Sequence, residues 1–242
     1  MKKLIGIVIP LLFFVSLSYA DSFSDIRTQV RRHVKDTGST LQRFSDDYID
    51  DLLNEGQKDV VNRTWCIVDV GTITLTAATT YYDLRGDMIA MSHAYYTDTS
   101  SNNTTLDEVM ERSLRQSTPD FDEDSGAPLE YFIRQSTSGV NDLEMGIRPV
   151  PSSITSESIT YHYYAQASDM SADADVPFEG LSHLISYHPI LGYYAVARLY
   201  LIEGKLDRAT GYNTLYETGV SIMRERIGMA PNYSPSFKTN TR

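Results

Sequence analysis

The spacing of apolar residues changes twice along the 242-residue chain, and this change most constrains the fold. Near the start, Ile26, Val30 and Val34 recur every four residues, which is close to the period of an amphipathic helix. In the middle, residues 72–76 alternate strictly between Thr and an apolar residue, as a half-buried strand does. Helical spacing returns after Pro189. The sequence therefore predicts an α+β fold in which helices at both ends flank a β-rich segment.

Two helices are predicted near the start of the chain. The first covers residues 24–35, with Ser24 as its N-cap. The second begins at Ser45 and ends near Trp65, and it carries acids in its first turn, where the helix dipole favours them. The apolar face predicted for this second helix consists of Tyr48, Ile49, Leu52, Leu53, Val60 and Val61.

The middle of the chain is predicted to be rich in strands. They are expected around residues 72–76, 79–84, 88–96, 129–134, 142–147 and 158–164. In the last of them, Ile159, Tyr161 and Tyr163 share one face. Two polar stretches, residues 97–105 and 117–128, are predicted to be loops. Residues 106–114 between them are predicted to form a short helix.

Two more helices are predicted near the end, from Pro189 to Gly204 and from Leu206 to Ile227. The helices at both ends have apolar faces that must be covered, so we expect them to pack together as one bundle. The expected division is a helical bundle of residues 21–66 and 181–229, an inserted β-rich module of residues 67–180, and a flexible C-terminal tail of residues 230–242.

The first twenty residues are similar to a secretory signal peptide. Lys2 and Lys3 precede the apolar run Leu4–Leu17, and small residues then occupy the positions that a signal peptidase reads. Cleavage after Ala20 would leave Asp21 as the first residue. A transmembrane anchor would need roughly 20 apolar residues, more than this run offers. An uncleaved, buried helix is the remaining alternative for this segment.

Charge and cysteine content limit the classes of function. The formal net charge is −11, which argues against binding the outside of a nucleic-acid duplex, where Lys and Arg must neutralise phosphates. It is compatible with a channel through which DNA slides without sticking, and equally with a solvated acidic surface. Cys66 is the only cysteine, so no disulfide can form within the chain, and we expect Cys66 to pack as a small hydrophobic residue.

The residues with catalytic or metal-binding potential form no motif that we can assign. The five His residues (His33, His93, His162, His183 and His188) include no H-E-x-x-H pair, and there is no second Cys to share a zinc site. Acidic runs starting at Asp120 and Asp169 resemble calcium loops, but both lack the Gly and Glu that an EF-hand requires at its sixth and twelfth positions.

Motifs for nucleophilic catalysis and nucleotide binding are also missing from the sequence: there is no G-x-S-x-G, no Walker loop and no G-x-G-x-x-G. The aromatic stretch at residues 161–164 either stacks sugars or combines core and interface positions. We therefore predict a protein that acts by binding, is not an enzyme, has no cofactor, and has no catalytic, cofactor-binding or metal-binding residues.

Between residues 22 and 228, short motifs follow one another in an order that we can compare with known families. The most specific is Leu-Asn-Glu-Gly-Gln at residues 53–57, followed by Arg63 and Trp65. The others are Thr72–Leu84, Gly126–Pro128 with Tyr131, Ile147–Pro151, Tyr161–Tyr164, Asp173–Pro177, and His188–Leu191 with Tyr194 and Ala195. In this order, the motifs resemble the head-to-tail adaptor, or connector, proteins of tailed bacteriophages and prophages.

The resemblance implies a structural virion protein that is assembled in the host cytoplasm. Copies of the chain would form a ring docked under the portal protein, extend the DNA channel, and provide a platform for the next tail component. DNA would pass without sequence-specific binding. The helical part would contact the portal, and the C-terminal tail would reach along a neighbour or into the portal. The resemblance implies no cofactor.

The first twenty residues depart from the pattern of that family, whose members usually begin near the position of Asp21. Either this segment is a misplaced start, or it targets the protein to the membrane or periplasm. These residues favour the alternative of an exported structural or ligand-binding protein of the bacterial envelope, located in the periplasm or secreted after cleavage at Ala20. A periplasmic hydrolase is a further alternative.

Overall fold

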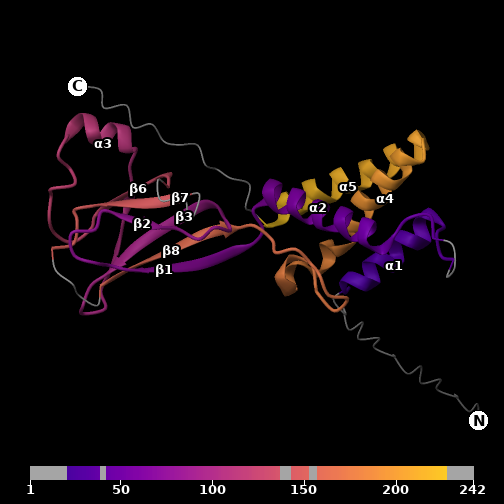
Figure 1. The fold of residues 1–242 in the computed structure, drawn as a ribbon, viewed down its shortest axis with the longest axis horizontal. Helices are drawn as coiled ribbons and strands as arrows, with labels where there is room; N and C mark the ends of the chain where they lie inside the picture. Colours follow the sequence, from indigo (N-terminus) through magenta and orange to yellow (C-terminus); the bar gives the residue numbers. More distant parts are fainter. Residues whose placement is uncertain (1–20, 39–41, 137–142, 153–156, 228–242) are drawn as a thin grey trace, which may run out of the picture.

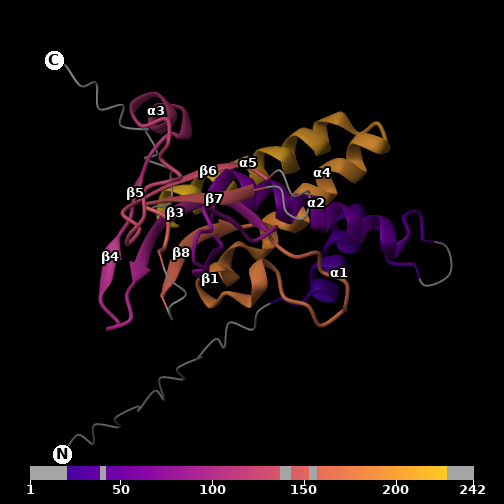
Figure 2. The same ribbon diagram turned by 60° about the vertical axis from the view of Figure 1, so that its left-hand side comes forward.

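The computed structural model describes residues 21–38, 42–136, 143–152 and 157–227. Within these ranges the chain forms five α-helices and two four-stranded sheets, which confirms the predicted α+β class. The sheets lie at one end of an elongated molecule, and the long helices lie at the other (Figures 1 and 2). The segment 1–20 and the tail 230–242, for which a signal-peptide-like character and flexibility were predicted, lie outside the described residues.

Helix α1 (Phe23–Val34) is capped by Ser22, so the prediction of Ser24 as the N-cap is wrong. The Ser22 hydroxyl accepts a hydrogen bond from the Asp25 backbone N–H at 3.2 Å, and the Asp25 carboxylate accepts one from the Ser22 N–H at 3.1 Å. This capping box satisfies two backbone donors at the helix start, an advantage that Ser24 cannot provide from inside the first turn.

Helix α2 (Asp46–Thr64) has the predicted N-cap, Ser45, and its predicted apolar face is buried with one exception. Tyr48 is 38% exposed, because it lies in the first turn, where its hydroxyl can remain in water. Arg27 of α1 joins the two helices, since its guanidinium donates hydrogen bonds to both carboxylate oxygens of Asp50, at 2.6 and 2.7 Å.

The first sheet has the strand order β1-β8-β3-β4, and all neighbouring strands are antiparallel. Its strands are β1 (Val68–Thr74), β8 (Ser158–Ala165), β3 (Met88–Thr97) and β4 (Asn103–Thr105). Ile159, Tyr161 and Tyr163, which were predicted to share one face of β8, are buried. β4 lies in a stretch that was predicted to be loop. All three of its residues are polar and exposed, so the sequence shows no alternation there.

The second sheet has the order β2-β7-β6-β5, with β5 parallel to β6. Its strands are β2 (Tyr81–Asp83), β7 (Leu143–Arg148), β6 (Glu130–Gln135) and β5 (Asp107–Glu108). The helix predicted at residues 106–114 is wrong in position, because its first half contains β5 and helix α3 covers Glu111–Ser117. Leu114 of α3 packs with Phe121 and Phe132, and this contact decides where the short helix forms.

Two short 3-10 helices, η1 (Phe178–Gly180) and η2 (Ser182–Tyr187), lead into α4 (His188–Ile202), and α5 (Leu206–Ile227) follows. Helix α4 contacts α1, α2 and α5, and buried side chains from these helices and from both sheets belong to one core cluster. Gly204, with φ of 71°, makes the turn between α4 and α5, a left-handed conformation that favours glycine.

Candidate functional site

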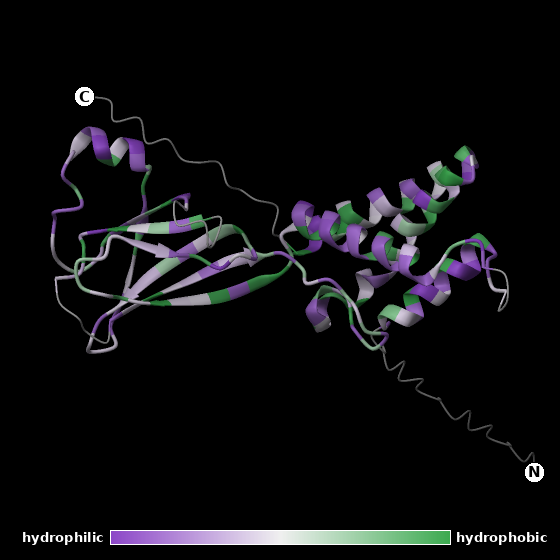
Figure 3. Cartoon of the chain, viewed as in Figure 1, coloured by the Kyte–Doolittle hydropathy of each residue, from purple (hydrophilic) through white to green (hydrophobic). Residues whose placement is uncertain are grey.

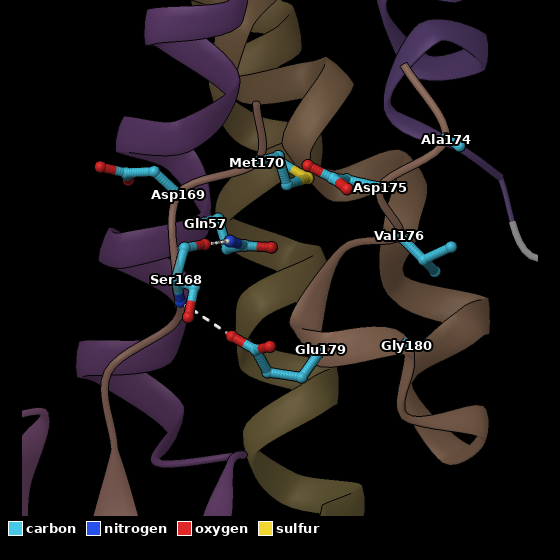
Figure 4. Close-up of a pocket in the computed structure, with 9 residues that line it drawn as sticks. All are labelled: Gln57, Ser168, Asp169, Met170, Ala174, Asp175, Val176, Glu179 and Gly180. Carbon is cyan, nitrogen blue, oxygen red and sulfur yellow. Dashed lines mark hydrogen bonds between the residues drawn. The ribbon is translucent and has the colours of Figure 1, made fainter. Parts of the chain in front are cut away.

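The segment between β8 and α4 runs along α2 and lines a hollow of about 480 Å³ (Figure 4). Gln57 of α2 lies in its wall and is 2% exposed. Its amide nitrogen donates to the Ser168 carbonyl at 2.9 Å, and its amide oxygen accepts from the Phe178 N–H at 2.8 Å. The Ser168 N–H in turn donates to the Glu179 carboxylate at 2.8 Å. These hydrogen bonds hold two parts of the segment on one helix.

Asn54 lies one helical turn before Gln57 and binds the same segment. Its amide nitrogen donates to the Met170 carbonyl at 3.0 Å, and its amide oxygen accepts from the Met170 N–H at 2.9 Å. The amides of Asn54 and Gln57 therefore use their hydrogen-bonding groups on the protein's own backbone. We conclude that they hold the segment between β8 and α4 against α2.

Gly56 lies between these two amides and faces α4. A Cβ atom at this position would be 3.0 Å from Cδ1 of Tyr194, so glycine lets α2 and α4 approach closely. The Tyr194 ring also packs edge-on against Tyr216 of α5, with ring centroids 5.2 Å apart. The Leu-Asn-Glu-Gly-Gln motif is thus a structural junction. The sequence pattern that predicts this role is a pair of polar residues at i and i+3 within an apolar face, which is typical of buried amides.

A second hollow, of about 350 Å³, adjoins the first and is lined by Asp69, Arg85 and Asp87. The Tyr163 hydroxyl lies 3.1 Å from Oδ2 of Asp69 and 3.2 Å from Oδ1 of Asp87, and can donate its proton to either carboxylate. Burial and the two negative charges raise the pKa of Tyr163, so the hydroxyl stays protonated and remains a donor. This cluster joins β1, β8 and the turn before β3.

The two acidic runs that resemble calcium loops are engaged with protein groups. Asp124 pairs with Arg148 at 2.8 Å, Asp169 pairs with Lys58 at 2.6 Å, and Asp175 accepts two backbone N–H groups of its own loop. In the described part of the chain, no group of three or more His, Cys, Asp or Glu side chains is arranged to hold a metal ion.

The cysteine and the histidines occupy separate environments. Cys66 is buried, as predicted, and burial raises the pKa of its thiol. His93 and His162 stack across β3 and β8 with ring centroids 4.4 Å apart. His183 is exposed, whereas His188 is fully buried, and neither of its ring nitrogens has a hydrogen-bond partner among the described residues.

Apolar side chains are exposed where α4 turns into α5, at the end of the helical part away from the sheets (Figure 1). Leu201, Ile202 and Leu206 are between 46% and 65% exposed. Figure 3 shows green segments beside white and purple ones at this end of the helical hairpin. An exposed cluster of large aliphatic residues is typical of a surface that another protein covers.

The helices within the described ranges do not combine the length and apolar composition that a membrane crossing requires. In comparisons with known proteins, a family model described as SU10 adaptor protein matches residues 21–235, which is most of the chain. No curated protein matches the chain.

Proposed function

Because the chain belongs to the SU10 adaptor protein family, the structural head-to-tail adaptors of phages, we propose that it docks under the portal ring and extends the DNA channel toward the tail. Family membership makes it a structural component of a phage particle, whose partners are the portal and tail components. The match over residues 21–235 is the observation that carries this proposal. The alternative of an exported envelope protein is not supported by it.

The exposed end of the α4–α5 hairpin is our candidate for the portal contact. Leu201, Ile202 and Leu206 would lose water on docking, and removing apolar side chains from water favours association. This end lies away from the sheets, so portal docking there would leave the sheets outside the portal contact (Figure 1).

In this proposal, different parts of the chain contact different partners. The helical unit of residues 21–66 and 181–229 forms the bundle that contacts the portal, and the inserted module of residues 67–180 forms the platform for the tail. The tail of residues 230–242 adds contacts to a neighbouring copy or to the portal. Identical copies form a ring, because repeated head-to-tail contacts close on themselves when the rotation between subunits allows it.

The acidic balance of the chain supports the channel role. A net charge of −11 repels the phosphates of DNA, so a ring of such chains would let DNA slide without retaining it. We propose that the protein acts by binding alone, without cofactor or catalysis, as is general for structural adaptors.

Portal binding by a variant of the hairpin end tests the docking surface. Ile202→Asp combined with Leu206→Asp should weaken retention on purified portal rings by at least about tenfold, because two charges would enter an apolar contact. Leu129→Asp is the matched control, since Leu129 is 56% exposed in a loop before β6. Equal retention of the double variant and the control would reject the hairpin end as the portal contact.

Mass spectrometry of purified particles tests the function itself. We expect the chain in fixed proportion to the portal protein. Particles that contain portal and tail proteins but lack this chain would contradict the adaptor function.

A further inference from the structure

The outer face of the first sheet carries no charged side chain on its three longest strands. Residues of β1 and β8 alternate between the core and this outer face in register, and β3 follows them with two irregularities, between Met88 and Ala90 and between Met91 and His93. The outward residues of β1 are Val68, Val70, Thr72 and Thr74. Opposite them, β8 presents Ser158, Thr160, His162 and Tyr164, and β3 presents Ala90, His93, Tyr95 and Thr97. Such a face is unusual in a chain in which 22% of residues are charged.

Aromatic side chains order this face before any partner arrives. Trp65, just before β1, packs on Tyr164 with ring centroids 5.0 Å apart. The stacked pair of His93 and His162 lies on the same face, and the ring centroids of Tyr95 and His162 are 6.1 Å apart. Contacts between neighbouring rings restrict their rotamers, so binding a partner costs less conformational entropy.

The outer face of the second sheet differs in both charge and cover. Arg134 pairs there with Glu144 at 2.5 Å, and Arg148 pairs with Asp124. Phe132 of the same face is buried under α3 and the loop after it. The open, uncharged surface is therefore a property of the first sheet, not of both.

A second uncharged surface lies on α5. Its exposed residues between Arg208 and Arg224 are neutral except Glu217, which pairs with Arg63 at 2.6 Å. Leu215 and Ile222, two helical turns apart, are 50% and 41% exposed. In Figures 1 and 2, α5 lies along the upper side of the molecule, whereas β1 and β8 lie along the lower side.

We propose that these two surfaces bind each other between neighbouring copies, so that the outer face of β1-β8-β3 packs on the outer face of α5. This inference rests on the proposed function, which requires a ring. Chains with a net charge of −11 repel one another, and a contact through uncharged surfaces keeps that repulsion small. Two different patches of one chain that bind each other make a head-to-tail contact, which builds a ring when the rotation between subunits closes.

The chemistry of the sheet face also favours a protein as its binding partner. It offers no Lys or Arg to a phosphate backbone, which excludes DNA as the ligand of this face. A helix bearing Leu, Ile, Thr and Ser matches its Val, Thr and aromatic residues in polarity, and helix-on-sheet packing is a standard layer arrangement.

The test measures how full-length chains fill purified portal rings at limiting concentration, by mass photometry. Wild-type chains should fill rings cooperatively, giving empty and complete rings with few intermediates. Val70→Glu and Leu215→Glu should each give partly filled rings and require at least about tenfold more protein for half filling, because each places a charge in the contact. Leu129→Glu, which lies outside both surfaces, should behave as wild type.

A double variant with opposite charges on the two surfaces distinguishes the loss of the contact between copies from damage to the fold. Val70→Lys combined with Leu215→Glu should recover cooperative filling, since each charge then meets its opposite on the neighbour. Cooperative filling by either single Glu variant would overturn the interface while leaving the portal-docking function intact. Failure of wild-type chains to bind portal rings at all would instead reject the proposed function. Loss of cooperativity in Val70→Glu alone would assign the sheet face to another partner and overturn the pairing with α5.

Discussion

The side-chain oxygen of Gln57 accepts a hydrogen bond from the backbone N–H of Phe178 at 2.8 Å, across 121 positions of sequence. The bond is buried, and it holds the segment before α4 on α2. Together with the bonds of Asn54 to Met170, it ties the helices that precede the sheets to the helices that follow them. These polar contacts add to the hydrophobic core that the helices and both sheets share.

Replacing Gln57 by Leu should destabilise the protein by about 2–4 kcal/mol, because the Phe178 N–H and the Ser168 carbonyl would lose their buried partner. The free energy of unfolding from urea titration measures this. Gln166→Leu is the control, since Gln166 is exposed, and it should change stability by less than about 0.5 kcal/mol. A Gln57→Leu variant as stable as the control would show that the hydrogen bonds of Gln57 do not stabilise the fold.

Two glycines should respond to Ala in opposite directions. A Cβ at Gly146 would lie 2.1 Å from Cζ of Phe132, so Gly146→Ala should cost about 1–3 kcal/mol through overpacking. Gly211, in an exposed turn of α5, has no atom within 4 Å of such a Cβ, so Gly211→Ala should stabilise by about 0.4–1 kcal/mol. Thermal melting of both variants checks this, and a shared sign would refute the packing described here.

His188 should make stability depend on pH. Burial lowers the pKa of His188 below its ordinary value of 6.5, so the folded state resists protonation more than the unfolded state does. As the pH falls below about 6.5, the unfolded chain gains a proton that the folded chain does not, and stability is lost.

His188→Leu should remove that part of the pH dependence and stabilise the protein at pH 7 by about 1–2 kcal/mol, because it removes two buried nitrogens without partners among the described residues. Unfolding free energies at pH 7.5 and 5.5 measure both effects, with His183→Leu as the exposed control. An unchanged pH slope in His188→Leu would contradict the assignment.

Leu53→Asp should unfold the chain, since Leu53 is fully buried in the core and its replacement would place an unpaired charge there. The expected cost exceeds about 4 kcal/mol, which is beyond ordinary substitutions. Circular dichroism and melting would detect it, with Leu129→Asp as an exposed control. A native spectrum and melting temperature for Leu53→Asp would mean that the core of α2 is wrongly assigned.

The sequence by itself determined the elements in which apolar residues recur at a regular spacing. The start of α5 at Leu206 matches the prediction, and the residues predicted to share one face of β8 are buried together, because a regular spacing of apolar residues marks the buried side of an element. The buried position of Cys66 was likewise readable from its local context.

Only the tertiary structure decided the features that depend on distant partners. The three exposed polar residues of β4 form a strand because β3 supplies their hydrogen bonds, and α3 forms where Leu114 reaches Phe121 and Phe132. Likewise, the roles of Asn54 and Gln57 became visible only once the segment after β8 lay against them. The periodicity of apolar residues indicates which side of an element is buried. It does not indicate which other element covers that side, because that depends on packing between residues far apart in the sequence.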